Sequence, residues 1–450
     1  MKIDSRDGLK MRFNSRLTGQ WPLVLKTALL SLMVVCVFSS VTVFAEENGG
    51  SSRKTVKAPA MSEKVYKKLT AAQELIEAKK YDEGLAQLRE LEQQKGLSNY
   101  EKAQLYNYFA YTYFTLEKYK DAIRSYEKVL AQPDLPEALV QNSLYTLSQL
   151  YFILEDYNKA VETIKRWFAV TDKPTENAYM LLGQGYYQLG KYKEALVPLK
   201  TAYKLVTDRG DKPRENLLLL LRVVYFNLND YNNMLAVLHE LVELYPKDEY
   251  WLTMAGTYSE LKQLKKQMSI LEMLYDRGRL DKGNQQLNLA NLYLLHDVPY
   301  KAAKLMEKGV KQGKIEKTEK NLQLLSQAWL QAQEPDKSIP PLVQAAKISK
   351  DGDIDMRLAQ AYISLDKYKE AVDALKAGMK KGGVKRPDQA NIMLGMAEFE
   401  LQNFNEAKSA FKLASEDKRS QKAAEQWLDY VNNEQSRKKQ LEESLKRRRN

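Results

Sequence analysis

Few residues of this chain could serve as a catalytic base, a nucleophile or a metal ligand. Its 450 residues include two histidines, His239 and His296, and a single cysteine, Cys36. The histidines lie far apart in the sequence and no His-Glu-x-x-His pair occurs, which excludes the common zinc hydrolase site and most serine–histidine arrangements. No Gly-rich phosphate-binding loop of the G-x-x-x-x-G-K-S/T type is present either. We therefore predict that the chain is not an enzyme and that it holds no metal and no cofactor.

The positive charge of the chain is concentrated at its two ends. The net charge is +12, of which residues 1–26 carry +4 and residues 437–450 carry +5. The remaining +3 is too little for the broad basic face that neutralises nucleic-acid phosphates, so we expect no nucleic-acid partner. The basic C-terminal end is either a solvated tail or a contact for anionic lipid or an acidic partner.

The N-terminal segment has the three parts of an export signal. Basic residues precede an apolar run, Leu23 to Phe38, and Val43-Phe44-Ala45 follows it with short residues where a signal peptidase cleaves. We predict a signal peptide over residues 1–45 and a flexible leader over 46–61. The alternative is an uncleaved signal anchor, because Leu23 to Ala45 could span ~30 Å as a helix. Either prediction delivers the rest of the chain across a membrane, into the periplasm of a bacterium.

Beyond residue 60 the chain repeats the phrase Leu-x-x-Tyr-x-x-Ala. It occurs at Leu116–Ala122, Leu154–Ala160, Leu189–Ala195 and Leu365–Ala371. Weaker versions place the same final position at Gly84, Met234, Gln267, Ala302, Ser338 and Ala407. These ten final residues, here called the marker residues, follow one another at steps of 33 to 39 residues. The period fits the ~34-residue tetratricopeptide repeat, a pair of antiparallel helices.

Apolar residues recur at fixed offsets from each marker residue. A large ring stands nine residues before it in most repeats, an apolar residue stands four before that ring, and another apolar residue stands four after the marker. These offsets place the side chains on one face of each of two helices. We therefore predict an all-α, right-handed superhelical α-solenoid of about ten helix-turn-helix repeats over residues 62–418. The pattern departs at Gly84, Met234 and Gln267, and Glu398 stands where a ring is expected.

The segment 419–450 is predicted to be a capping helix followed by a basic tail. A terminal repeat has only one neighbour, so an array needs a helix with a polar outer face at its end. A short apolar stripe suits that role, and its members are Ala423, Ala424, Trp427, Leu428 and Val431.

The repeats resemble the tetratricopeptide family, in which the first helix of each repeat lines a concave groove where partners bind. Carried onto this sequence, the resemblance and the helical offsets predict a groove of amides with adjacent rings. The predicted groove residues are Gln104, Tyr111, Phe114, Asn142, Gln149, Phe152, Asn177, Gln184, Tyr187, Asn216, Phe226 and Asn291. Amides can bond an extended peptide backbone and rings can form pockets for its side chains. The alternative is that the amides are merely tolerated on exposed faces and the rings pack between adjacent first helices.

The chain as a whole resembles the tetratricopeptide proteins that accompany TonB-ExbB-ExbD systems of Gram-negative bacteria. The shared features are the export segment, the lack of cysteine after it, and a long array that opens with the helix Ala71–Ile76. The resemblance implies a periplasmic scaffold whose partner is a TonB-like protein or its membrane complex, in support of uptake through the outer membrane. The alternative is a scaffold for envelope polysaccharide, pilus or outer-membrane protein assembly.

Overall fold

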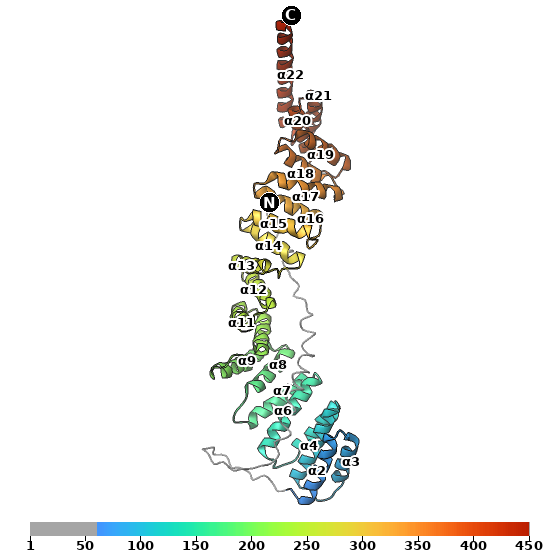
Figure 1. The fold of residues 1–450 in the computed structure, drawn as a ribbon, viewed down its shortest axis with the longest axis vertical. Coiled ribbons are helices and arrows are strands. Elements are labelled where there is room, and N and C mark those ends of the chain that lie inside the picture. The colour runs from blue at the N-terminus through green and yellow to red at the C-terminus, as the bar shows by residue number, and fades with distance from the viewer. Residues whose placement is uncertain (1–60, 450) are drawn as a thin grey trace. The chain divides into compact units, whose positions relative to one another are not determined.

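The computed structural model describes the backbone of residues 61–449 and the side chains up to residue 445 (Figure 1). Every regular element in this range is an α-helix, and the predicted all-α class of helix-turn-helix repeats is confirmed. The predicted signal segment, residues 1–45, and the predicted leader up to residue 60 lie outside the described residues. Within residues 61–449, no helix is both long and apolar enough to cross a membrane.

The described residues form two compact units, which divide between Leu244 and Tyr245. The described part of the first unit holds five helical hairpins, in which each even-numbered helix packs on the helix that follows it. Its helices are α2 (Glu63–Glu77), α3 (Tyr81–Glu92), α4 (Asn99–Thr115), α5 (Tyr119–Leu130), α6 (Glu137–Ile153), α7 (Tyr157–Val170), α8 (Glu176–Gln188), α9 (Tyr192–Thr207), α10 (Glu215–Asn227) and α11 (Tyr231–Leu244).

The second unit holds five more hairpins and a terminal helix. Its helices are α12 (Asp248–Glu260), α13 (Leu264–Asp276), α14 (Gly283–Leu295), α15 (Pro299–Lys311), α16 (Glu319–Gln331), α17 (Pro335–Ile348), α18 (Asp353–Ile363), α19 (Tyr368–Lys381), α20 (Pro387–Glu400), α21 (Phe404–Ser415) and α22 (Gln421–Arg449). We call the even-numbered helices α2 to α20 the first helices of their hairpins, and the odd-numbered helices α3 to α21 the second helices.

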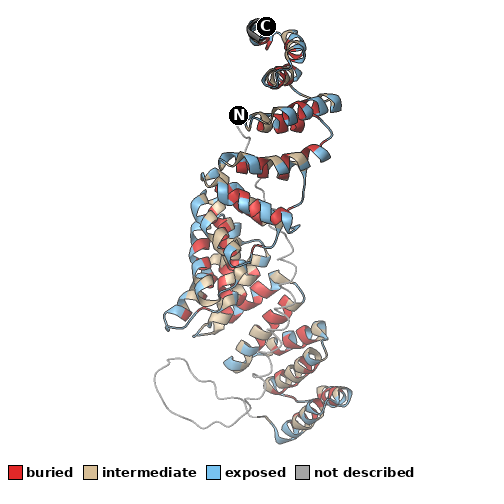
Figure 2. Cartoon of the chain, turned by 45° about the horizontal axis from the view of Figure 1, so that its top comes forward, coloured by how far each residue is buried: buried red, intermediate tan, exposed pale blue. Residues whose placement is uncertain are grey.

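All ten marker residues are buried inside their hairpins. Four of the ten markers are not alanine, namely Gly84, Met234, Gln267 and Ser338, and these four are buried as well. The apolar residues four positions after the markers are also buried, from Tyr126 in α5 to Phe411 in α21. Buried residues therefore follow the helix faces that turn towards neighbouring helices (Figure 2). The helix pairing read from the spacing is the pairing observed.

Each hairpin turns through one residue with a left-handed backbone. These ten residues have φ between 55° and 71°, and they are Lys79, Glu117, Glu155, Gly190, Asn229, Lys262, Asp297, Gln333, Asp366 and Gln402. The turn after α4 shows the hydrogen bonds: Lys118 N–H donates to Tyr113 O at 2.8 Å, and Glu117 N–H donates to Phe114 O at 2.9 Å. This is the Schellman pattern, which satisfies the last carbonyl groups of a helix. Only one of the ten residues is glycine, although glycine adopts this conformation at the lowest energy because it has no Cβ atom.

We predict opposite stability changes for exchanges at two of these turns. Glu155→Gly should raise the free energy of unfolding by about 0.5–1 kcal/mol, because it removes the strain of a Cβ in a left-handed backbone. Gly190→Ala should lower it by about as much, because it introduces that strain. Thermal unfolding followed by circular dichroism measures both changes. An unchanged midpoint for Gly190→Ala would show that the turn relaxes without cost.

Polar contacts tie one hairpin to the next at a recurring position. Tyr151 is the large ring nine residues before the marker Ala160, and its hydroxyl donates to Glu127 Oε1 on the preceding second helix at 2.7 Å. In the last hairpin Glu398 replaces the ring, is 2 % exposed, and pairs with Lys376 on the preceding second helix at 2.8 Å. Asn403 also donates to Glu398, at 2.7 Å. The missing ring therefore leaves the hairpin α20–α21 intact.

Glu101 joins the N-terminal ends of α2 and α4, the first helices of the first two hairpins. Its carboxylate accepts hydrogen bonds from Ser62 N–H at 3.0 Å and Ser62 Oγ at 2.6 Å, and from Ser98 N–H at 2.8 Å. Ser98 is the N-cap residue of α4 and Ser62 is the N-cap residue of α2, so the one side chain of Glu101 holds both helix starts. Burial of Glu101 would raise its pKa, but these hydrogen bonds outweigh burial and lower the pKa from its ordinary 4.5 to about 2.

A pH dependence of stability follows from the lowered pKa of Glu101. The contribution of the ionised group, about 2–3 kcal/mol, is complete above the ordinary pKa of 4.5 and is lost as the pH falls towards 2. Glu101→Gln should therefore lower the unfolding midpoint at pH 7, and the difference from the unchanged chain should shrink below about pH 4.5. Glu137→Gln is the matched control, because Glu137 begins α6 but is exposed. A pH-independent difference for Glu101→Gln would contradict the assignment.

The terminal helix α22 covers the last hairpin. Ala424 and Val431 are fully buried. Trp427 stacks on Phe411 of α21 with ring centroids 5.5 Å apart and an interplanar angle of 5°. The backbone of residues predicted to form the basic tail continues as helix to Arg449. The array thus ends on an aromatic contact rather than on an open seam.

Candidate partner-binding surfaces

The predicted groove residues all lie on first helices. Eleven of them belong to the first unit, on α4, α6, α8 and α10, whereas Asn291 lies on α14 of the second unit. In the first unit, Asn142, Asn216 and Phe226 are exposed, and six others are half-buried: Gln104, Tyr111, Phe114, Asn177, Gln184 and Tyr187. Asn291 in the second unit is exposed. No partner is present, so binding by these residues stays a prediction.

Two of the predicted groove residues need correction. Gln149 is 5 % exposed and Phe152 is 6 % exposed, so neither offers a surface to a partner in this structure. Both lie near the C-terminal end of α6, whose last turn is covered on nearly all sides. Helical offsets correctly placed them on one face of α6, but they could not show that neighbouring residues cover that face.

The rings among these residues have packing partners within their own hairpins. Phe114 packs on Tyr119 with ring centroids 5.9 Å apart, and Phe152 packs on Tyr157 at 5.7 Å. Tyr187 packs on Tyr192 at 5.7 Å. In each pair a ring near the end of the first helix meets the first residue of the second helix, five positions later, across the left-handed turn. These rings therefore brace the turns. Phe152 also packs against the adjacent first helix α8, because a Cβ atom added at Gly185 would lie 3.1 Å from its ring, as the alternative prediction expects. Phe114 and Tyr187 are half-buried, and the predicted pockets beside them stay a prediction.

Several of the predicted amides are already hydrogen-bonded. Gln104 donates to Tyr100 Oη at 3.1 Å. Arg214 donates to the amide oxygen of Asn177, which ties the start of α8 to the start of α10. Asn216 accepts from the backbone N–H of Leu217 at 2.9 Å. The part of the predicted surface that stays open on α4, α6 and α8 consists of Tyr111, Asn142, Gln184 and the outer side of Tyr187.

The different exposure of Phe152 and Phe226 predicts that their substitution by alanine lowers the free energy of unfolding by different amounts. Phe152→Ala should lower the free energy of unfolding by about 3 kcal/mol, because the ring is buried. Phe226→Ala should cost only about 1–2 kcal/mol, because Phe226 occupies the corresponding position in α10 but is 37 % exposed. Thermal unfolding followed by circular dichroism compares the two variants. Equal losses would mean that exposure does not decide the role of these rings.

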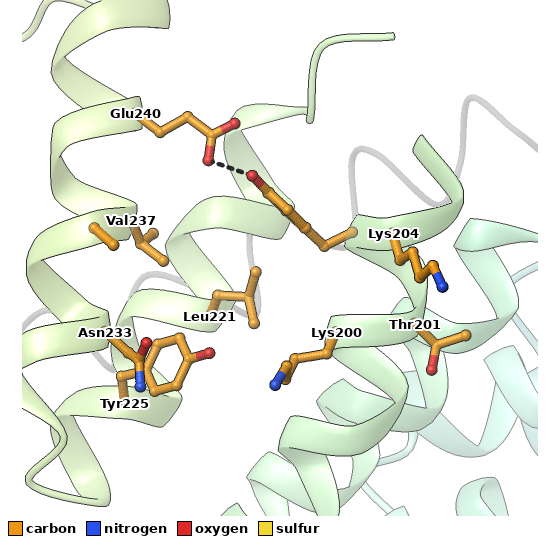
Figure 3. A pocket seen from close by; sticks show the side chains of 10 residues that line it. Lys200, Thr201, Lys204, Leu221, Tyr225, Asn233, Val237 and Glu240 are labelled. Atoms are coloured by element: carbon orange, nitrogen blue, oxygen red, sulfur yellow. Dashed lines mark hydrogen bonds between the residues drawn. The ribbon is translucent and has the colours of Figure 1, made fainter. Parts of the chain in front are cut away.

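A pocket that the sequence did not predict lies between α9, α10 and α11 (Figure 3). Its volume is about 510 Å³. Glu240, Val237 and Asn233 of α11 form one wall, and Lys200, Thr201 and Lys204 of α9 form the opposite wall. Leu221 and Tyr225 of α10 form the floor. Short side chains at Thr201, Asn233 and Ala236 leave space that longer side chains would fill.

One hydrogen bond crosses this pocket. Tyr203 Oη donates to Glu240 Oε2 at 3.0 Å, as the dashed line in Figure 3 shows. Burial raises the pKa of Glu240, the hydrogen bond from Tyr203 opposes that shift, and the nearby charge of Glu243 adds to it. Burial likewise raises the pKa of Tyr203, as does the charge of Glu240. The pocket therefore combines an apolar floor with a positioned carboxylate, and a signal for it was the acid Glu240 between the buried Val237, Leu238 and Leu241 of α11.

The two histidines belong to different units. His239 is on α11 of the first unit, and His296 is the C-cap residue of α14 in the second unit. Among the described residues, no group of three or more histidine, cysteine, aspartate or glutamate side chains is arranged to hold a metal ion.

Comparison with known proteins supports the repeat type. The family model described as "Anaphase-promoting complex, cyclosome, subunit 3", a tetratricopeptide-like family, matches residues 117–202, from the turn before α5 into α9. No match is found among curated proteins.

Solved structures with partial similarity include other repeat proteins. The crystal structure of MamA protein is 20 % identical, with 39 % of this chain and 95 % of that chain covered and a TM-score of 0.31. YrrB, described as a TPR protein with an unusual peptide-binding site, is 19 % identical over 39 % of this chain and 85 % of its own, with a TM-score of 0.33. A tetratricopeptide repeat protein from Parabacteroides merdae ATCC 43184 is 16 % identical over 58 % of this chain and 99 % of its own, with a TM-score of 0.33. The buried marker residues and the repeat period are consistent with a solenoid of tetratricopeptide-type repeats over the described residues, and the family match supports this repeat type within residues 117–202. Such a fold typically serves as a scaffold for protein–protein interaction.

Proposed function

We propose that this chain is an exported, non-enzymatic scaffold of the bacterial envelope that binds a protein partner along the first helices of its first unit. The hairpin repeats support the scaffold role, and the export-type sequence of residues 1–45 supports a periplasmic location. Such a scaffold works by presenting an extended surface rather than a reactive group.

The observation that carries the proposal is the open surface of α4, α6 and α8. Tyr111 and Tyr187 offer rings, while Asn142 and Gln184 offer amides. No hydrogen bond to another residue occupies the side-chain amide of Asn142 or Gln184 in the described part of the chain. An amide that is free to donate and accept suits the backbone of an extended peptide, and a ring beside it suits an apolar side chain.

The partner that best fits the sequence resemblance is a TonB-like protein of an energy-transduction system for outer-membrane uptake. The Pro-rich linker expected in such a partner is extended and loses little entropy on binding to a surface of amides and rings. The other envelope roles, in polysaccharide, pilus or outer-membrane protein assembly, would use the same surface with a different partner.

In-cell photo-crosslinking tests this proposal. A photoreactive residue at Gln184 of the full chain should give a discrete adduct with an envelope protein, which mass spectrometry identifies. The matched control is the same residue at Glu162, which is exposed on the second helix α7 and should not give that adduct.

The possible outcomes separate the parts of the proposal. A TonB-like protein in the adduct supports it in full, whereas another envelope-assembly protein retains the scaffold and overturns the TonB partner. A cytoplasmic protein overturns the export prediction. Identical adducts from Gln184 and Glu162, or adducts with abundant bulk protein alone, overturn binding along the first helices.

A further inference from the structure

The pocket between α9, α10 and α11 holds a carboxylate that lacks a cationic partner. Glu240 is half-buried and is bonded to the neutral hydroxyl of Tyr203. No ion pair within the described residues includes Glu240. Lys200 and Lys204 on the opposite wall are exposed and form no ion pair there either. The negative charge of Glu240 is therefore positioned but not neutralised.

Two other buried or half-buried glutamates at contacts between hairpins, Glu272 and Glu398, are neutralised by a lysine. Glu272 pairs with Lys301 at 2.6 Å, and that hydrogen bond lowers the pKa of Glu272. Glu398 pairs with Lys376 at 2.8 Å. For Glu240 burial instead raises the pKa, because no cation offsets the loss of solvent. A cation supplied from outside the chain could neutralise Glu240 as Lys301 neutralises Glu272.

The shape of the pocket suits a cation carried on an alkyl stem. Leu221, Tyr225 and Val237 form an apolar lining, and each is less than a tenth exposed as a whole residue. Long basic side chains bury their methylene groups against such surfaces and keep the charged head at a polar group. The 510 Å³ of space leaves room for the stem above this lining, with Glu240 at its edge.

We propose that this pocket binds a lysine or arginine side chain of a partner protein, with its stem on Leu221 and Val237 and its cationic head bonded to Glu240. The proposal rests on the scaffold function but uses the pocket between α9, α10 and α11 rather than the predicted groove. An uncharged or acidic side chain would remove Glu240 further from water without pairing it, which is unfavourable. Lys200 and Lys204 on the opposite wall would repel a bound cation, but both are exposed, so water and salt screen this repulsion more than the attraction of the half-buried Glu240.

Binding of defined peptides to the full chain tests the charge preference. The probes are blocked pentapeptides, acetyl-Ser-Gly-X-Gly-Ser-amide, with arginine, norleucine or glutamate at X. Methyl-labelled NMR follows the signals of Leu221 and Val237 during titration. The arginine peptide should shift these signals and bind at least about tenfold more tightly than the other two, because a hydrogen bond to a charged group is worth that factor. Equal or tighter binding of the norleucine or the glutamate peptide overturns the proposal.

Matched variants test the role of Glu240 itself. Glu240→Gln should weaken the arginine peptide about tenfold, whereas Glu243→Gln, an equal charge change on the same helix at an exposed position, should change it less than about twofold. Ala236→Phe, at an exposed lining residue, should fill the pocket and abolish the shifts with helicity retained. Equal losses for Glu240→Gln and Glu243→Gln, or full binding by Ala236→Phe, overturn the proposal. Such a failure leaves crosslinking at Gln184 unaffected, so the two proposals fail separately.

Discussion

The close approach of the two helices in each hairpin is the constraint on which the rest of this structure depends. A Cβ atom added at Gly183 of α8 would lie 2.5 Å from Leu199 of α9, and one at Gly395 of α20 would lie 2.6 Å from Phe411 of α21. Contacts this short leave no space for a larger side chain, so small residues are required where the helices touch. Once the helices are this close, only a tight turn can join them. The left-handed residue in every hairpin turn supplies it, even where the residue is a lysine or glutamate.

This constraint also explains which parts of the fold the sequence could predict. The marker residues and their apolar neighbours recur because each hairpin must satisfy the same close approach, so their spacing identified the helix pairs. The departures Met234 and Gln267 did not disturb the pairing, because both side chains are still buried between the helices. The division into two compact units at Leu244 has no comparable signal, since the repeat spacing continues through it.

The candidate surfaces were harder to predict, for two physical reasons. Helical offsets describe one helix at a time, whereas Phe114 and Tyr119 meet across a turn that reverses the chain. Three of the rings assigned to a groove, Phe114, Phe152 and Tyr187, also pack on their own turns, and Phe152 is buried against α8 as well. The pocket at Glu240 depends on short side chains from two second helices above an apolar floor, which requires the packing of three helices to be known. Helical offsets within one helix were sufficient to predict the amides on the open surface of the first helices, such as Gln184.

In the last hairpin, the hydrogen bond to the preceding hairpin is kept although its donor and acceptor residues are exchanged. In the third hairpin the ring Tyr151 donates its hydroxyl to Glu127, which stands five residues after the marker Ala122 on the preceding second helix. In the tenth hairpin the acid stands in the ring position, as Glu398, and Lys376 stands five residues after the marker Ala371. The donor and the acceptor have changed sides, but the hydrogen bond between successive hairpins is kept. Because Glu398 is 2 % exposed, its charge without Lys376 would be buried unpaired, so the departure at one position depends on the lysine at the other.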